Sequence, residues 1–260
     1  MMIVNLKNDI NRQYMTKYNF TPSTAKFNRF IVIHYVGATG GAEANAKYFQ
    51  QPNRGASAHV FVDHGGKLYQ SVEFDDIAWH CGGKKYTHGS CRNTNSIGIE
   101  LCCKKDDKGK WYFTEATRLS AIELTATLML QYDIPISNVV RHYDVTGKLC
   151  PEPYVNEEVW KGFLKEVKKA YANALGKYVT IAVSTLRDEH LLKVADMSTL
   201  SAAMKEKCQQ EKNKVMVKKG AVFSIIGIKQ DSTDGNIWGL TKSGYIIPIV
   251  YSNGIKAAKL

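Results

Sequence analysis

Apolar runs and amphipathic segments alternate over roughly the first two thirds of the chain. Residues 27–36 (FNRFIVIHYV) form a short β-branched apolar run after polar residues, which predicts a buried strand. Residues 96–103 (SIGIELCC) predict a second apolar strand. Residues 57–63 and 67–72 predict a hairpin around His-Gly-Gly, because glycine tolerates the positive φ of a tight turn.

Three segments have helical patterns. A glycine-rich loop leads into a short predicted helix at 42–49. Thr114 is the expected N-cap of a helix that runs to about Gln131, and residues 156–172 predict an amphipathic helix. Strands mixed with helices in this order predict an α/β domain over residues 1–173.

The pattern changes after this domain. Residues 174–178 are predicted to be a short linker. Residues 179–260 show short alternating strands separated by KKG, DGN and KSG turns, which predict a small all-β barrel. Residues 196–214 (DMSTLSAAMKEKCQQEKNK) read as a helical insert in that barrel.

Length and composition are typical of a globular protein. The 260 residues are 44% hydrophobic, enough to build a core. No stretch approaches the run of roughly 18 apolar residues that spans a bilayer, so no membrane insertion is expected. The N-terminus lacks the features of a secretory signal peptide, so we expect synthesis in the cytoplasm.

The formal net charge is +11, and it is spread along the chain. Such a charge attracts polyanions, which include nucleic acid, anionic lipid and anionic cell-wall polymers. A binder of single-stranded nucleic acid would interleave basic and aromatic residues, and no such run is present. Nucleic acid is therefore not an expected partner.

The six cysteines are even in number, but two of them are adjacent and no signal peptide precedes them. Reduced thiols are therefore expected. A bridge between Cys81 and Cys91 across the GGKKYTHGS loop stays open as an alternative.

The candidate metal-ligating and catalytic side chains are concentrated in RHYDVTGKLCP at 141–151 and in the apolar strand that carries His34. His34, His142 and Cys150 form a set of two imidazoles and one thiolate, which suits zinc with its fourth position open for catalysis. Lys148 would make a Cys150 thiolate electrostatically tolerable. The alternative is a hydrolase in which Cys150 is the nucleophile and histidines act as base and orienter.

Several motifs in order carry a family resemblance: VIHYVG, SAHVFVD, AWHCGG, NTNSIGIELC and RHYDVTGKLCPEPY. Residues of about 25–155 resemble the type-2 N-acetylmuramoyl-L-alanine amidases, a family that includes phage endolysins, bacterial autolysins and peptidoglycan recognition proteins. The resemblance implies a mixed sheet flanked by helices with Zn²⁺ in a surface groove. It also implies cleavage of the amide between the lactyl group of N-acetylmuramic acid and L-Ala of peptidoglycan.

The same resemblance implies roles for individual residues. His34, His142 and Cys150 take the metal-ligand positions, Glu100 takes that of a catalytic carboxylate, and Lys148 that of an oxyanion-stabilising lysine. Ala58 stands where some members carry a tyrosine, which places more weight on Glu100.

Other residues receive less specific roles. His80, Trp79 and His59 are expected to contact substrate, with orientation of a metal ligand as a second role for His80. Arg141 and Asp144 are candidates for fixing imidazole tautomers.

The C-terminal region, 178–257, more loosely resembles a bacterial SH3-like wall-binding domain, mainly through WGLTKSGYI. Its positive charge suits anionic wall polymers. The expected protein is thus a bacteriolytic amidase that acts at the wall after release from the cell. A zinc peptidase on the stem peptide and a non-catalytic peptidoglycan-binding module remain alternatives.

Overall fold

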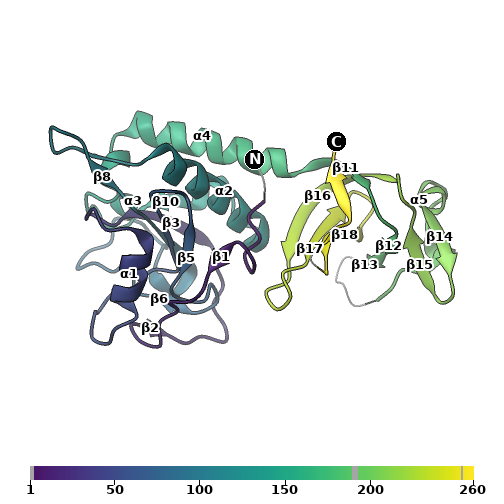
Figure 1. The fold of residues 1–260 in the computed structure, drawn as a ribbon, viewed down its shortest axis with the longest axis horizontal. Coiled ribbons are helices and arrows are strands. Elements are labelled where there is room, and N and C mark those ends of the chain that lie inside the picture. The colour runs from purple at the N-terminus through teal and green to yellow at the C-terminus, as the bar shows by residue number, and fades with distance from the viewer. Residues whose placement is uncertain (1–2, 189–192, 253) are drawn as a thin grey trace. The chain divides into compact units, whose positions relative to one another are not determined.

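The computed structural model describes residues 3–188, 193–252 and 254–260. The chain forms two compact units (Figure 1). The first comprises Met1–Val4 and Asp9–Tyr171, and the second comprises Asn5–Asn8 and Ala172–Leu260. Among the helices of the described residues, none combines the length and apolar character that a membrane crossing requires.

The first unit is built on a six-stranded mixed sheet in the order β1-β5-β4-β7-β3-β10. Only the β4–β5 pair in this sheet is antiparallel, among the described residues. The strands are β1 (Ile10–Asn11), β3 (Phe30–Tyr35), β4 (Val60–Val62), β5 (Leu68–Gln70), β7 (Ser96–Leu101) and β10 (Val139–Arg141). The mixed α/β architecture predicted from the sequence is confirmed.

Helices and short ribbons complete this unit. Thr114 Oγ1 accepts a hydrogen bond from the amide of Thr117, so the predicted N-cap of α2 is confirmed. The helices are α1 (Ala42–Phe49), α2 (Glu115–Tyr132), α3 (His142–Thr146) and α4 (Glu157–Ala174). The 3₁₀ turns are η1 (Asn93–Asn95), η2 (Ile136–Asn138) and η3 (Glu152–Tyr154). The ribbons are β2 (Phe20–Thr21) with β6 (Ile77–Ala78), and β8 (Lys104–Lys105) with β9 (Trp111–Tyr112).

The strand register decides which face of the sheet carries polar chemistry. Phe61, Glu100 and His34 are direct partners across β4, β7 and β3. Side chains opposite one another in neighbouring strands share a face, so these three lie in one row. Ile33 and Ile99 point to the other face and are fully buried.

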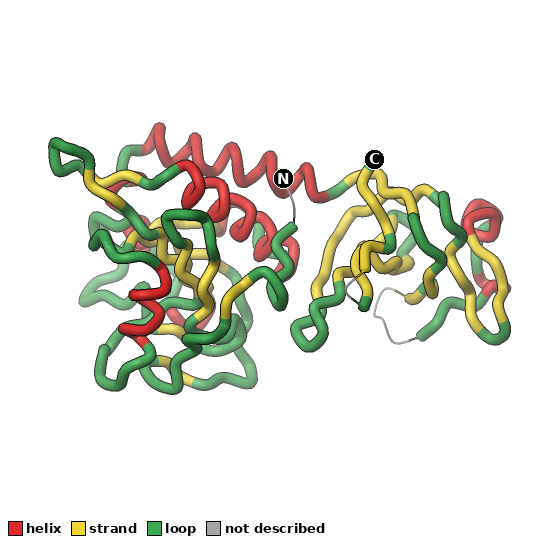
Figure 2. The backbone as a smooth tube through the Cα atoms, viewed as in Figure 1, coloured by secondary structure: helices red, strands yellow, loops and turns green. Residues whose placement is uncertain are grey.

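The second unit is mainly antiparallel strand and loop (Figure 2). One sheet has the order β13-β18-β17-β16-β11-β20 with β19 on β18, and the other has the order β12-β15-β14. The strands are β11 (Gly176–Thr180), β12 (Ser184–Thr185), β13 (Arg187–Asp188), β14 (Cys208–Glu211), β15 (Lys214–Val217), β16 (Val222–Gln230), β17 (Ile237–Thr241), β18 (Tyr245–Tyr251), β19 (Gly254–Ile255) and β20 (Ala257–Lys259).

A segment from the chain's start also belongs to the second unit. The amide of Leu6 donates to the side-chain oxygen of Gln230 at 2.8 Å, and the Asn5 side chain donates to the carbonyl of Gly235 at 2.9 Å. Nothing in the hydrophobic pattern signals this pairing, because it joins residues more than two hundred positions apart.

Two local predictions are corrected. The expected linker at 174–178 is not a linker, because α4 continues to Ala174 and β11 begins at Gly176. The expected helix over 196–214 is mostly wrong: only η4 (Met197–Thr199) and α5 (Ala202–Lys207) are helical. From Cys208 on, the segment forms the β14–β15 hairpin, which turns through Lys212 at a φ of 53° and buries Val215 and Val217.

All six cysteines are buried free thiols.

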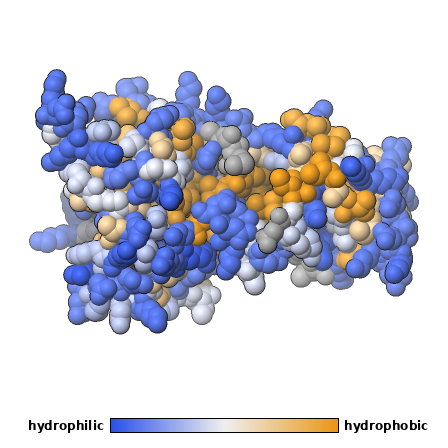
Figure 3. All heavy atoms as spheres, viewed as in Figure 1, coloured by the Kyte–Doolittle hydropathy of each residue, from blue (hydrophilic) through white to orange (hydrophobic). Residues whose placement is uncertain are grey.

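In the space-filling view, hydrophilic residues cover most of the visible surface of the first unit (Figure 3).

Candidate metal centre

Two parallel strands and one turn bring the three predicted ligands to one edge of the sheet. His34 lies near the end of β3, and His142 directly follows β10, whose last residue Arg141 pairs with Ile33. Because parallel strands end at the same edge, this register places the two imidazoles side by side. Cys150 lies in the turn after α3, and its carbonyl accepts from the amide of Tyr143 at 2.7 Å.

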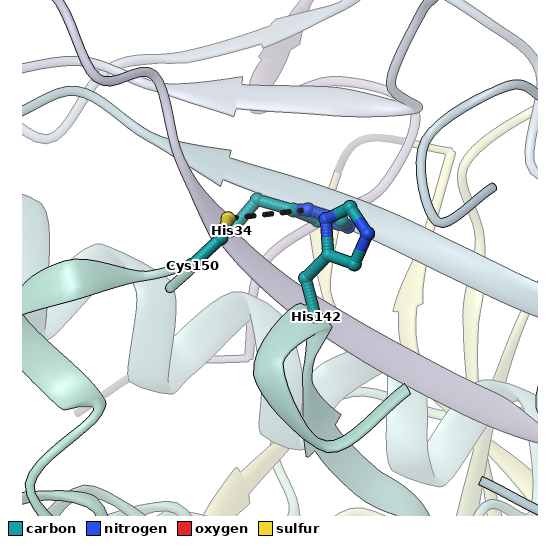
Figure 4. A group of neighbouring side chains, drawn as sticks. All are labelled: His34, His142 and Cys150. Carbon is teal, nitrogen blue, oxygen red and sulfur yellow. Dashed lines mark hydrogen bonds between the residues drawn. The ribbon is translucent and has the colours of Figure 1, made fainter. Parts of the chain in front are cut away.

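The three side chains converge closely (Figure 4). Their candidate ligand atoms all lie within 4.8 Å of one another, and all three residues are buried. Cys150 Sγ lies 3.7 Å from His34 Nδ1, and the rings of His34 and His142 have centroids 4.8 Å apart. A buried cluster of two imidazole nitrogens and one cysteine sulfur is a donor set that zinc prefers.

Unpartnered nitrogens are further evidence that the residues fit a metal. Both ring nitrogens of His142 are buried and have no hydrogen-bond partner among the described residues. A buried polar group without a partner is costly, and most such groups in proteins are satisfied. A cation held by His34, His142 and Cys150 would satisfy this imidazole.

A chain of hydrogen bonds fixes the tautomer of His34. Ser96 Oγ donates its one proton to the carbonyl of Arg92 at 2.6 Å, so it must accept from His80 Nε2 at 3.2 Å. The other ring nitrogen of His80 then accepts from His34 Nε2 at 3.0 Å. This leaves the lone pair of His34 Nδ1 facing Cys150, so His34 is set to bind a metal through Nδ1.

The position of His80 depends on a glycine in the neighbouring strand. A Cβ at Gly98 would lie 2.5 Å from Cγ of the His80 ring. We expect Gly98→Ala to displace that ring and to weaken zinc binding by about 10–100-fold, the usual effect of losing such a support. Competition with a chromogenic chelator measures the affinity.

Gly227→Ala, where a Cβ meets nothing closer than 3.6 Å, is the matched control. Equal zinc affinity in the Gly98→Ala protein and the control would show that His80 does not support the site.

Burial sets the protonation of the ligands. Desolvation lowers the pKa of His34 well below its ordinary value and lowers that of His142 to about 4, so both imidazoles are neutral at neutral pH. Desolvation also raises the pKa of the Cys150 thiol to about 12. In the metal-free protein, only the cysteine among these ligands must lose a proton to bind zinc.

Glu100 lies beside the cluster. Its Oε1 is 4.0 Å from His34 Nδ1, and its Oε2 is buried without a hydrogen-bond partner among the described residues. Desolvation raises the pKa of Glu100 to about 7, and the Lys148 charge opposes this rise. A carboxyl group with a pKa near neutrality can both take up and return a proton.

Lys148 is exposed on the turn between α3 and Cys150. Gly147 ends α3 with a φ of 80°, a conformation that favours glycine, and so turns the chain toward the site. The Lys148 charge lowers the pKa of His142, Glu100 and Cys150. It therefore contributes positive potential at the place where the ligands converge.

Two of the residues predicted to contact substrate, His59 and His80, are buried and bond to other parts of the protein. His59 is fully buried, and its ring bonds to the amide of Gly98 and the carbonyl of Asp76, so it supports the sheet. His80 is also buried, and it holds His34. Trp79 is the remaining candidate, because 36% of it is exposed and its indole donates to Thr21.

Arg141 and Asp144 are paired with each other rather than with a ligand imidazole. Their side chains form an ion pair at 2.7 Å, and the same guanidinium reaches Glu157 at 3.0 Å. This network ties the start of α3, and with it the backbone of His142, to α4. The expected tautomer role belongs to His80 instead.

An apolar cavity that no sequence pattern predicted lies next to Glu100. It has a volume of about 280 Å³ and is lined by Glu100 together with Val36, Ala38, Asn45, Tyr48, Phe49 and Phe61. The one sequence signal for this cavity was the helical pattern of 42–49. It places Tyr48, a large aromatic residue that is half exposed, on α1 at the cavity wall. The cavity offers an apolar surface for a substrate held next to the carboxylate.

Comparisons with known proteins point to one family. Residues 24–153 match the family described as N-acetylmuramoyl-L-alanine amidase. The chain is similar to the N-acetylmuramoyl-L-alanine amidase CwlL of Bacillus licheniformis, with 33% identity over 137 residues that make up 49% of this chain and 37% of CwlL. It therefore spans well under two thirds of that relative's length.

Solved structures of endolysins are similar to part of the chain. A mutant endolysin from Bacillus subtilis has a TM-score of 0.51 and 27% identity, covering 64% of this chain and 99% of the endolysin. The solution structure of the PlyG catalytic domain has a TM-score of 0.52 and 27% identity, covering 62% and 94%. The residues that match the family, 24–153, all lie in the first unit.

Proposed function

The chain belongs to the N-acetylmuramoyl-L-alanine amidase family, and we propose that it is a zinc-dependent hydrolase of peptidoglycan. The bond cleaved is the amide between the lactyl group of N-acetylmuramic acid and L-Ala of the stem peptide. One observation carries the proposal: the buried cluster of His34, His142 and Cys150 lies beside Glu100, whose nearer oxygen is 4.0 Å from His34.

Zinc, when held by His34, His142 and Cys150, supplies Lewis-acid chemistry, which polarises a carbonyl and makes water acidic enough to react near neutral pH. Glu100 takes the proton from the attacking water and returns it to the leaving nitrogen of L-Ala. The cavity beside Glu100 holds part of the substrate against the carboxylate. Lys148 stabilises the negative charge that develops on the carbonyl oxygen.

The two parts of the chain have different tasks in this proposal. The first unit is the catalytic domain, and residues 179–260 of the second unit form an SH3-like wall-binding domain. The positive charge of the latter suits anionic wall polymers, and linking two weak binding modules raises the local concentration of the enzyme at the bacterial wall.

Digestion of purified peptidoglycan, followed by mass spectrometry of the new ends, tests this function. We expect stem peptides with a free L-Ala amine and glycan with free lactyl carboxyl groups. New ends within the stem peptide would show a peptidase instead, and an undigested wall would show a binding module.

Zinc affinity is expected to depend on pH. Cys150 loses one proton on binding, so affinity rises at least about tenfold per pH unit. Near pH 6, Glu100 with its pKa of about 7 also carries a proton that the cation expels, so the rise approaches about a hundredfold per unit there. Affinity is therefore lost as pH falls.

Chelator competition between pH 6 and pH 9 measures this dependence, and calorimetry in buffers of different ionisation enthalpy counts the protons released. Glu100→Gln should lower the slope near pH 6 to about tenfold per unit, because only the cysteine proton is then released. A pH-independent affinity would show that Cys150 does not bind the ion as a thiolate.

A further inference from the structure

A second cavity lies within the C-terminal unit, where β12 and β15 of the small sheet approach β17 and β18 of the larger one. Its volume is about 270 Å³. This is close to the lower end of the roughly 300–1,000 Å³ typical of small-molecule pockets, room for about one ring-sized unit. Trp238 and Pro248 line it from β17 and β18, and Met216 from β15.

The rim of this cavity is cationic. Arg187, Lys214 and Lys256 line it, and no acidic residue does so among the described residues. The Arg187 guanidinium carbon lies 5.8 Å from the centroid of the Trp238 ring, and the half-exposed Tyr251 packs edge-on against the same ring at 5.5 Å. Positive charge and aromatic surface are therefore presented at one place.

Ser184 is an independent sign that the cavity receives a ligand. It lines the cavity, is only 8% exposed, and its hydroxyl oxygen has no hydrogen-bond partner among the described residues. Leaving a buried hydroxyl unpaired costs about 1–3 kcal/mol. A polar ligand in the cavity would satisfy it.

We propose that this cavity binds one saccharide unit that bears an anionic group. The apolar face of the sugar ring packs on Trp238 and Tyr251, and a sugar hydroxyl bonds to Ser184. The anionic group, a phosphate or a carboxylate, pairs with Lys214 and Lys256, two cations that a compact anion can approach together.

A nucleotide has a similar combination of ring and charge. The choice of a saccharide rests on the proposed function, since the substrate of the catalytic unit is a glycan-bearing wall. Binding and catalysis are therefore measured separately in the test.

The test uses the full chain with Glu100→Gln, so that the wall is not digested, in a sedimentation assay with purified bacterial wall. In this background, Lys214→Gln with Lys256→Gln should weaken binding about tenfold or more at low salt. Lys219→Gln with Lys242→Gln removes the same charge from exposed positions of the same unit and should change binding less than about twofold.

Ser184→Ala separates ligand binding from folding. Because the substitution removes a buried hydroxyl with no partner in the described ranges, the melting temperature should stay the same or rise, whereas wall binding should weaken about threefold. A lower melting temperature with unchanged binding would show that the hydroxyl has a structural partner and would overturn the proposal.

Walls stripped with hydrofluoric acid, which removes phosphodiester-linked polymers, identify the anionic group. If stripping abolishes binding that depends on Lys214 and Lys256, the group is a phosphate; if the dependence persists, it is a carboxylate. Equal wall binding by the two double variants overturns the proposal. Polyuridylic acid serves as the nucleotide ligand for comparison. If Lys214→Gln with Lys256→Gln weakens binding to polyuridylic acid but not to the wall, the proposal is also overturned. If the cavity binds the wall but the wild-type chain, with Glu100 in place and zinc supplied, releases no L-Ala amine, the proposed function alone is refuted.

Discussion

Cys150→Ser should remove both bound zinc and lytic activity. Zinc sites of four ligands bind with about 10–16 kcal/mol, so one ligand contributes about 3 kcal/mol or more, on the order of a hundredfold in affinity. Serine is a poor zinc ligand at neutral pH, since its hydroxyl does not ionise. His142→Ala should have the same effect, because it removes the imidazole whose buried nitrogens have no hydrogen-bond partner in the part of the chain that the structure describes.

Metal content after gel filtration and the rate of wall lysis are measured together. Cys208→Ser is the matched control, because Cys208 and Cys150 are both 2% exposed and Cys208 lies in the other unit. Full lytic activity in a verified metal-free sample of the wild-type protein would refute zinc dependence.

Glu100→Gln should keep zinc and lose turnover. The amide has the shape of the carboxylate but cannot take a proton, and loss of general acid–base catalysis typically costs about 10²–10⁴-fold in rate. Because Glu100 is not among the three converging ligands, the metal content should stay at the wild-type level. This separation distinguishes Glu100 from His34, His142 and Cys150.

The rate of amine release on a soluble muropeptide gives the effect on turnover without wall binding. Glu123→Gln on α2 makes the same chemical change outside the site and should leave the rate unchanged. A wild-type rate in Glu100→Gln would assign the proton transfer to another group.

Hydrophobic periodicity predicted the fold of the first unit well. The runs at 27–36 and 96–103 became β3 and β7, the two buried strands at the site, and the helices at 42–49, 114–131 and 156–172 were found near their predicted bounds. These elements are long or strongly patterned, so local sequence dominates their structure. Residues 196–214 were misread, because a two-residue turn at Lys212 interrupts a segment of good helix formers.

Residue types and the family resemblance together predicted His34, His142 and Cys150 as a ligand set, and the structure brings these three side chains together. They did not reveal that His80 sets the tautomer of His34, that His59 is a core residue, or that Gly98 makes room for His80.

The sequence by itself determined which atoms are available for chemistry and which strands carry them. Only the tertiary structure decided which nitrogen of His34 faces Cys150 and which polar groups lie beside the cavity in the second unit. Those facts depend on strand order and register. Tertiary packing places His34 against His80, and it places Ser184 and Trp238 around one cavity. No periodicity along the chain encodes such neighbours.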